Sequence, residues 1–143
     1  MDIKEKIHSL SEDLLKNIER LVVINSQLGT PAEGMPFGPG PAKALDEALS
    51  IARELGFKTV NLDHYCGYAE MGEGDDIVGI AGHLDIVPAG GDWTYDPFAL
   101  TRKGDYVYGR GTTDDKGPVL EALYAMKLLR DSGIRLNKRV RLI

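Results

Sequence analysis

Two short clusters of polar residues in this 143-residue sequence could carry out hydrolytic chemistry. The first is Gly82-His83-Leu84-Asp85, which follows an apolar run that begins at Ile77. Residues two apart in an extended backbone point to the same side, so we expect His83 and Asp85 to face one site. A carboxylate beside an imidazole can accept the second N–H of the ring and strengthen the ring as a metal ligand. A His-x-Asp spacing on its own also occurs as a structural pair, so this cluster alone does not indicate a function.

The second cluster joins a predicted strand to a predicted helix and reads Gly-Arg-Gly-Thr-Thr-Asp-Asp-Lys-Gly-Pro over residues 109–118. Adjacent carboxylates at such a junction repel each other unless a cation or the helix dipole offsets their charge. One interpretation is that Asp115 caps the helix while Asp114 is solvated. The other is that Asp114 bridges two metal ions, as carboxylates do in two-metal hydrolases. The residues themselves leave both interpretations open.

The glycines of this region do not form a nucleotide-binding motif. The pair Gly104 and Gly109 is followed by Arg110-Gly111, where a phosphate-binding loop needs Lys and then Ser or Thr. The run from Gly109 to Asp114 lacks the third glycine of the dinucleotide fingerprint. No Gly-x-Ser-x-Gly sequence is present either. The patterns therefore support neither phosphate binding nor a serine nucleophile.

The elements that must position these clusters alternate between helices and strands, which is typical of an α/β sheet flanked by helices. Ile3 to Ile24, for example, has apolar residues at three- and four-residue steps and predicts an amphipathic helix. The run from Ile77 to Gly82 has no polar alternation, which indicates a strand covered on both faces. The predicted elements are helices over 3–24, 41–55 and 118–131, strands over 58–62, 65–71, 77–82 and 139–143, and a hairpin over 98–108.

The composition restricts the partners and the compartment. A formal net charge of -5 argues against a nucleic-acid binder, because phosphate contacts need clustered Lys and Arg. The one basic run, Lys138, Arg139 and Arg141, is interpreted as the solvated face of a strand. No segment approaches the roughly 20 apolar residues of a membrane span, and the N-terminus has no export signal. Cys66, the only cysteine, cannot form an internal disulfide, so a reducing, cytoplasmic location is expected.

Taken together, the two clusters resemble metallopeptidase family twenty. The shared pattern is a His-x-Asp strand end, then Trp93-Thr-Tyr-Asp-Pro-Phe98, then Gly-Arg-Gly-x-x-Asp-Asp-Lys-Gly. The stretches Gly-His-Leu-Asp-Ile-Val-Pro-Ala-Gly and Gly-Asp-Trp-x-x-Asp-Pro-Phe are most similar to its PepV-type dipeptidase branch. Carboxypeptidase G, aminoacylase and carnosinase are other members. The likeness is collinear over essentially the whole chain and covers about the first third of such an enzyme.

This resemblance implies a role for individual residues. His83 would bind one zinc ion, and Asp85 would be the catalytic-site carboxylate that holds the His83 ring. Asp114 would bridge both metals, with the Asp114–Asp115 peptide in the cis form. The implied cofactor is zinc, two ions per complete site, with manganese or cobalt as alternatives. The implied substrate is a dipeptide, whose peptide bond a metal-activated water would hydrolyse.

The sequence departs from the family pattern in what it lacks. Family members complete the site with a Glu-Glu pair, a further acidic ligand and a late histidine, and none of these falls within the 143 residues. His8 and His64 do not occupy the late histidine position and are expected at the surface. We therefore expect residues 1–143 to be the N-terminal part of the catalytic metallopeptidase domain, without its lid domain and its remaining catalytic part.

The resemblance also implies a fold and an association state. The expected fold is a partial three-layer α/β/α sandwich with a mostly parallel mixed sheet. The isolated fragment is expected to be inactive and to self-associate through an exposed strand edge. Two alternative functions remain: an N-acyl amino acid amidohydrolase of the same family, and a non-catalytic binding fragment.

Overall fold

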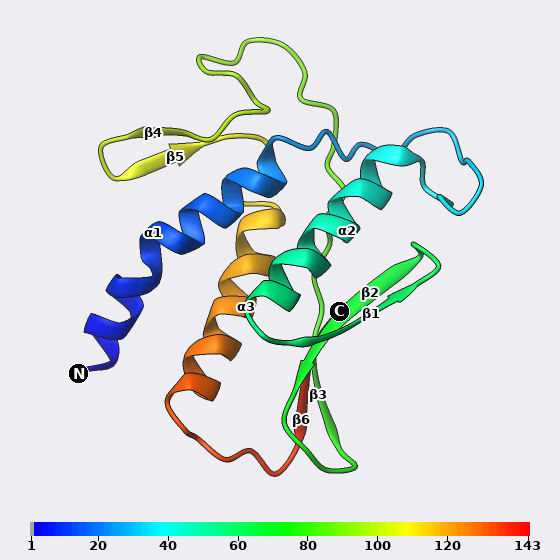
Figure 1. Ribbon diagram of the computed structural model, residues 1–143. Coiled ribbons are helices and arrows are strands. Elements are labelled where there is room, and N and C mark those ends of the chain that lie inside the picture. Colours follow the sequence, from blue (N-terminus) through cyan, green and yellow to red (C-terminus); the bar gives the residue numbers. More distant parts are fainter. Residues whose placement is uncertain (1) are drawn as a thin grey trace.

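The computed structural model describes residues 2–143, which form three helices, a four-stranded sheet and a separate hairpin (Figure 1). The helices are α1 (Ile3–Val22), α2 (Pro39–Glu54) and α3 (Lys116–Asp131). The strands are β1 (Lys58–Leu62), β2 (Cys66–Met71), β3 (Ile77–Ile80), β4 (Thr101–Lys103), β5 (Tyr106–Tyr108) and β6 (Arg139–Leu142). Every element predicted from the sequence is present, with boundaries that differ by a few residues.

The main sheet has the strand order β1-β2-β6-β3, and its pairings are of both kinds. β6 is parallel to β3 and antiparallel to β2, and β1 is antiparallel to β2. The predicted α/β class and the mixed sheet are confirmed. The sheet of the described residues is not mostly parallel, however, because short turns before and after β2 reverse the chain. Only the long connection through α3 brings a strand, β6, back parallel to its neighbour.

The helices cover one face of this sheet. α2 packs on β1 and β2, and α3 packs on β6 and β2. α1 packs chiefly against α3, beside which it lies in Figure 1, and also contacts α2. One buried cluster joins Leu21 of α1, Ile51 of α2 and Leu120 of α3 to Ala69 and Leu142 of the sheet. The described residues therefore form two layers of the predicted three-layer sandwich.

The prediction that β3 is covered on both faces is wrong for the described residues. Ile77 is 43% exposed and Val78 is 48% exposed. The reason is that β3 is an edge strand of a sheet whose second face carries no helix here. On that open face Arg141 donates to Glu70 at 2.8 Å, and Arg139 lies 3.7 Å from the same carboxylate. These two arginines are half-buried and paired with acid, whereas Lys138 is exposed as expected.

Helix α1 has clear signals at both ends. At its start the Asp2 N–H donates to Glu5 at 3.1 Å, which is half of a capping box. Near its end Arg20 donates to Glu47 at 2.6 Å and to Glu54 at 2.7 and 2.9 Å, which fixes α1 against α2. Across residues 2–143 no helix is both long and apolar enough to cross a bilayer.

The sheet and α3 meet where the polar clusters lie. Ile143 N–H donates to the Ile80 carbonyl at 2.8 Å, and Gly82 N–H donates to the Ile143 carbonyl at 3.0 Å. The segment after β3 therefore continues along β6 and delivers His83 at the C-terminal end of the strand. This end of the sheet is where α/β proteins bind ligands.

Candidate metal site

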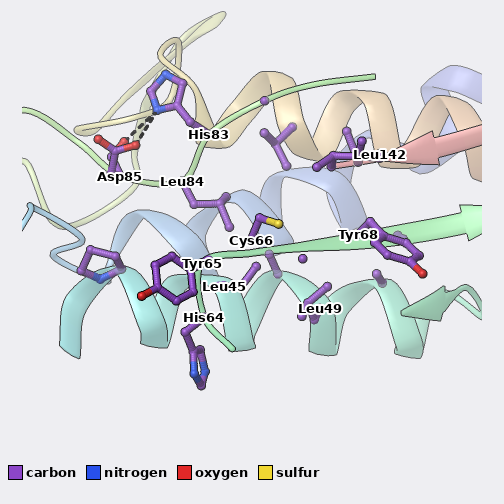
Figure 2. Close-up of a pocket in the computed structure, with 18 of the residues that line it drawn as sticks. Leu45, Leu49, His64, Tyr65, Cys66, Tyr68, His83, Leu84, Asp85 and Leu142 are labelled. Atoms are coloured by element: carbon purple, nitrogen blue, oxygen red, sulfur yellow. Dashed lines mark hydrogen bonds and ion pairs between the residues drawn. The ribbon is translucent and has the colours of Figure 1, made fainter. Parts of the chain in front are cut away.

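Both ring nitrogens of His83 contact a carboxylate. The Nε2 atom lies 3.0 Å from Oδ1 of Asp114, at the start of α3. The Nδ1 atom lies 3.2 Å from Oδ1 of Asp85 and 3.1 Å from the Asp85 carbonyl oxygen, as the dashed lines in Figure 2 show. The two sequence clusters thus meet at one imidazole, with Asp114 on one side and Asp85 on the other.

Asp115 binds the backbone of His83 rather than its ring. Its Oδ2 accepts the His83 backbone N–H at 3.2 Å, and it makes no side-chain capping bond to α3 although it occupies the N-cap position. The interpretation of Asp115 as a simple helix cap is therefore wrong, because its carboxylate is directed at the His83 segment instead. A side chain at Gly82 would lie 2.9 Å from that carboxylate, so only glycine permits this approach. The Asp114–Asp115 peptide is cis, as the resemblance implied.

The charge state of His83 is set by these neighbours. Burial lowers the pKa of its imidazole, but the hydrogen bonds to Asp114 and Asp85 outweigh burial and raise the pKa above its ordinary value of 6.5. The Asp114 side chain is 82% exposed, so its second oxygen is open to solvent or to a ligand. The carboxylates of Asp114 and Asp85 thus stabilise a positive charge on the His83 ring.

The residues present suit a divalent metal in type and spacing. An imidazole nitrogen and a carboxylate oxygen are ordinary zinc ligands, and each lies about 2.0 to 2.2 Å from the ion, so two that share an ion lie within about 3.5 Å of each other. His83 and Asp114, at 3.0 Å, meet that condition. Within residues 2–143, however, no group of three or more His, Cys, Asp or Glu side chains is placed so that it could hold a metal ion by itself. His83 and Asp114 therefore have the donor types and the spacing of two metal ligands, fewer than a complete site needs.

A cavity of about 440 Å³ lies beside His83. Figure 2 shows it between the His83–Asp85 segment, β2 and α2, with Leu45, Leu49 and Leu142 among its walls. The walls are mainly apolar. The His83 ring and its two carboxylate partners lie at the solvent-exposed rim of this cavity.

Lys116 is a residue of the site region that the sequence analysis did not single out. Its side chain is fully buried, and its Nζ donates to the carbonyl oxygens of Leu21 at 2.8 Å and Ile24 at 2.7 Å. Burial lowers the pKa of Lys116 to about 8. A signal was available, because Lys116 precedes Leu120 and Leu123 at four- and seven-residue steps, which places it on the core face of α3.

The Trp93 to Phe98 motif has a structural role in the region after Asp85. The Arg110 guanidinium lies 5.1 Å from the Trp93 ring and donates to the carbonyls of Pro88 at 3.4 Å and Ala89 at 3.3 Å. Trp93 Nε1 donates to the same Ala89 carbonyl at 2.7 Å. The second cluster therefore fixes the loop that follows the first one.

The other histidines and the cysteine lie outside the His83 pair. His8 is exposed on α1, and Cys66 is an exposed free thiol at the start of β2. His64 lies in the turn between β1 and β2, as predicted, but its ring is held by Asp46 at 3.0 Å and the Gly34 carbonyl at 2.9 Å. It joins α2 to the segment between α1 and α2 that contains Gly34, and lies outside the candidate metal site.

Comparisons with known proteins agree with this geometry. A family model described as "Peptidase family M20/M25/M40" matches residues 79–143, which include both polar clusters. The Bacillus subtilis (strain 168) protein named "Putative dipeptidase YtjP" is 43% identical over 134 residues, which are 92% of this chain and 29% of that protein. A Staphylococcus aureus (strain USA300) protein of the same description is 40% identical over 142 residues, which are 98% of this chain and 30% of that protein. The chain thus spans about 30% of the length of these relatives.

Two solved structures share the fold. Human carnosine dipeptidase 1 matches with a TM-score of 0.77 at 25% identity, over 96% of this chain and 32% of that chain. A metallo-carboxypeptidase of the M20 family from Sulfolobus solfataricus matches with a TM-score of 0.73 at 25% identity, over 99% of this chain and 30% of that chain. The arrangement of helices and strands described above is therefore that of a peptidase domain, over the part that this chain covers.

Proposed function

The chain belongs to the peptidase family M20/M25/M40, and from this premise we propose that it is the N-terminal part of the catalytic domain of a zinc-dependent dipeptidase. The observation that carries the proposal is the single imidazole of His83, held between Asp85 and Asp114 at 3.2 and 3.0 Å. Relatives of 40 to 43% identity that are named as dipeptidases support the substrate class. The lid and the remaining catalytic residues would belong to a longer protein.

Each residue of the pair has a separate task in this proposal. His83 would bind one zinc ion through Nε2, and Asp114, with its second oxygen free, would bind the same ion and a second one. Asp85 would accept the Nδ1 proton of His83, which fixes the tautomer and directs Nε2 toward the metal. Asp115 would hold the His83 backbone in place. Manganese or cobalt could replace zinc, because both accept the same donor atoms.

In the proposed hydrolysis, the task of this chain would be to hold the metal and to orient the His83 ring. Zinc bound at such a site lowers the pKa of a water molecule and polarises the scissile carbonyl. His83 and Asp114 would hold the charge that makes this possible, and Asp85 would keep the imidazole from rotating. The described residues offer only two direct ligands, and a catalytic zinc usually has three. We therefore expect the 143-residue chain alone to be inactive.

The test is substitution in a longer protein that contains this chain. His83→Ala and Asp114→Ala are each expected to abolish metal-dependent dipeptide hydrolysis and to reduce bound zinc. His64→Ala is the matched control, because His64 is also paired with a carboxylate but lies outside the site. Near-normal turnover with normal zinc content in either site variant would contradict the proposal.

The proposed partner is a dipeptide, and the test should include its competitors. A panel of free dipeptides, N-acetyl amino acids and N-succinyl amino acids compares dipeptidase with deacylase activity. Faster hydrolysis of the N-acyl compounds would favour the amidohydrolase alternative while leaving the metal ligands unchanged. We also propose that the isolated chain self-associates, since its sheet has an exposed edge at β3.

A further inference from the structure

One short stretch of backbone contacts both halves of the candidate metal site. His83 and Asp114 lie 31 positions apart in the sequence. Residues 21–26, which we call the α1 turn, comprise the end of α1 and the residues that follow it. Three polar side chains are buried in the described part of the chain, those of Asn17, Ser26 and Lys116. Two of them, Ser26 and Lys116, connect the α1 turn to the metal site.

Lys116 connects the α1 turn to the Asp114 half. Its ammonium donates to Leu21 O at 2.8 Å and to Ile24 O at 2.7 Å. A lysine at the last carbonyls of a helix satisfies their hydrogen bonds and interacts favourably with the negative end of the helix dipole. Only Asp115 separates Lys116 from Asp114, so this contact also limits where Asp114 can lie.

Ser26 connects the α1 turn to the His83 half. Its Oγ donates to the Leu84 carbonyl at 2.6 Å, and its own carbonyl accepts the Ile86 N–H at 3.3 Å. Leu84 and Ile86 are the two neighbours of Asp85, so the backbone is held on both sides of that residue. Ser26 has no exposed surface, so water does not replace these bonds.

Glycines at two positions let the neighbouring segments approach this closely. A Cβ atom at Gly40 would lie 2.3 Å from the Asn25 carbonyl oxygen. A Cβ atom at Gly111 would lie 2.9 Å from Cδ of Lys116, so glycine leaves the path of the lysine side chain open. Backbone packed this tightly has little freedom to shift. The α1 turn is therefore packed closely against the start of α2 at Gly40, and the Lys116 side chain that reaches it is packed closely against Gly111.

We propose that the α1 turn sets the distance between the two halves of the metal site, with Ser26 and Lys116 as its positioning residues. Both act through the backbone of other residues, because neither side chain contacts His83 or Asp114. Groups that hydrogen-bond directly to a metal ligand typically contribute about 10- to 100-fold to metal affinity, and we expect the loss of either positioning residue to have an effect of that order. The claim that a metal binds between His83 and Asp114 rests on the proposed function. The contacts of the α1 turn with both halves of the site do not depend on it.

The first experiment measures the geometry without metal. The His83 amide donates to Asp115 across the two halves, so its hydrogen exchange rate reports their separation. In Ser26→Ala and in Lys116→Met, we expect this amide to exchange about tenfold faster or more, relative to the core amide of Leu123. Asn17→Ala is the matched control, because it removes a buried hydrogen bond to Tyr124 at 2.6 Å that is not part of the α1 turn. If the ratio of the His83 exchange rate to the Leu123 exchange rate is unchanged in both Ser26→Ala and Lys116→Met, the proposal is overturned.

The second experiment measures Mn²⁺ affinity from the paramagnetic broadening of NMR signals near His83. Ser26→Ala and Lys116→Met should each bind Mn²⁺ about 10- to 100-fold more weakly than the natural chain, while Asn17→Ala should bind it as tightly as the natural chain does. Restoring the ammonium should restore affinity. This is done with Lys116→Cys in a Cys66→Ser background, alkylated with 2-bromoethylamine while unfolded and then refolded.

The two experiments separate failure of the inference from failure of the proposed function. If the natural chain binds Mn²⁺ no better than His83→Ala, the proposed metal ligation fails in this chain, and the His83 exchange ratio still decides the role of the α1 turn. If binding depends on His83 and both site variants bind as tightly as the natural chain, the positioning role is overturned.

Discussion

The two carboxylates beside His83 contact different nitrogens of its ring. In the proposed site, one carboxylate would bind the metal and the other would orient the ring. Asp114 faces Nε2, the atom on the α3 side, and Asp85 faces Nδ1. In the proposed site, loss of Asp114 would remove a metal ligand, whereas loss of Asp85 would leave both ligands in place with a ring that is free to rotate. Substitutions at the two aspartates should therefore have effects of different size.

Asp85→Asn is expected to weaken metal binding without unfolding the protein. The amide of asparagine can still accept a hydrogen bond but carries no charge, so affinity should fall about 10- to 100-fold, as for other groups that orient a metal ligand. Stability should change little, because the Asp85 side chain is 61% exposed. Competition with a chromophoric chelator in a longer protein measures the affinity. Asp92→Asn, at an exposed aspartate in the next loop, is the control, and equal affinity in both variants would contradict the role of Asp85.

Gly117 is the residue at which the start of α3 is most sensitive to added volume. A Cβ atom there would lie 2.0 Å from the Thr112 carbonyl oxygen, so the loop that carries Asp114 would have to move. Gly117→Ala is expected to lower the free energy of unfolding by about 1 to 3 kcal/mol or more, as overpacking does. Gly79→Ala, where no atom lies within 4 Å, should change it by less than about 0.5 kcal/mol. Urea denaturation of both variants provides the comparison, and equal effects would contradict this account.

Among the elements, those with a strong local signal could be predicted from the sequence. The period of apolar residues predicted α1, and Pro41 and Gly56 predicted the two ends of α2, because proline suits a first helical turn and glycine suits the residue after a helix. The observed helix begins two residues earlier, at Pro39, and Gly56 has a φ of 88°. The pairing of strands could not be predicted in the same way. An apolar run such as Ile77 to Ile80 has the same composition at a sheet edge as in a sheet centre, and only the position of β6 decides between them.

The contact between α1 and α2 predicts how stability depends on pH. Arg20 of α1 donates two hydrogen bonds to the Glu54 carboxylate of α2, and these bonds hold the pKa of Glu54 at about 2 in the folded chain, below the ordinary 4.5. A lowered pKa means that this contribution is fully present above pH 4.5 and is lost as pH falls toward 2. We therefore expect the natural chain to lose more stability than Arg20→Gln between pH 5 and pH 3, as measured by urea denaturation.

The control for this prediction is a second exposed ion pair. Arg102 of β4 contacts Glu12 of α1 at 2.8 Å, and it makes no contact with α2. Arg102→Gln should therefore keep the acid sensitivity of the natural chain. High salt should reduce the difference between the natural chain and Arg20→Gln, since exposed charges are screened. Identical acid sensitivity in the natural chain and Arg20→Gln at low salt would show that the α1–α2 ion pair contributes nothing measurable.

The sequence predicted which residues of the candidate site come together, but not the residues that hold them in place. His83, Asp85 and Asp114 were visible because their types and spacing are those of metal chemistry. Ser26 was not, because a serine in a loop has many ordinary roles and its bond to Leu84 links residues 58 positions apart. Lys116 was visible only as part of a motif, since its partners are backbone carbonyls, which any sequence can provide.

At the scale of the whole molecule, residues 2–143 cover the main sheet on one face and leave the other face open. The helices and the buried cluster lie on one side (Figure 1), while the other side carries Arg141 stacked on Tyr68 at 3.9 Å and paired with Glu70. The outer edge of β3 is apolar and uncharged, with Val78 48% exposed. Natural proteins usually block such edges with charge or cover them, so this edge is open to pairing with another chain.

The isolated chain should therefore self-associate, and the edge of β3 should be the surface responsible. We expect its average mass in light scattering to rise with concentration under reducing conditions, which prevent disulfides through the exposed Cys66. Val78→Lys should reduce this association, because a charged side chain on an edge strand opposes pairing by another strand. Ile7→Lys changes a similarly exposed apolar residue on α1, far from the sheet, and should leave the association unchanged. A natural chain that stays monomeric at its highest soluble concentration would show that the β3 edge is too short, at four residues, to pair on its own.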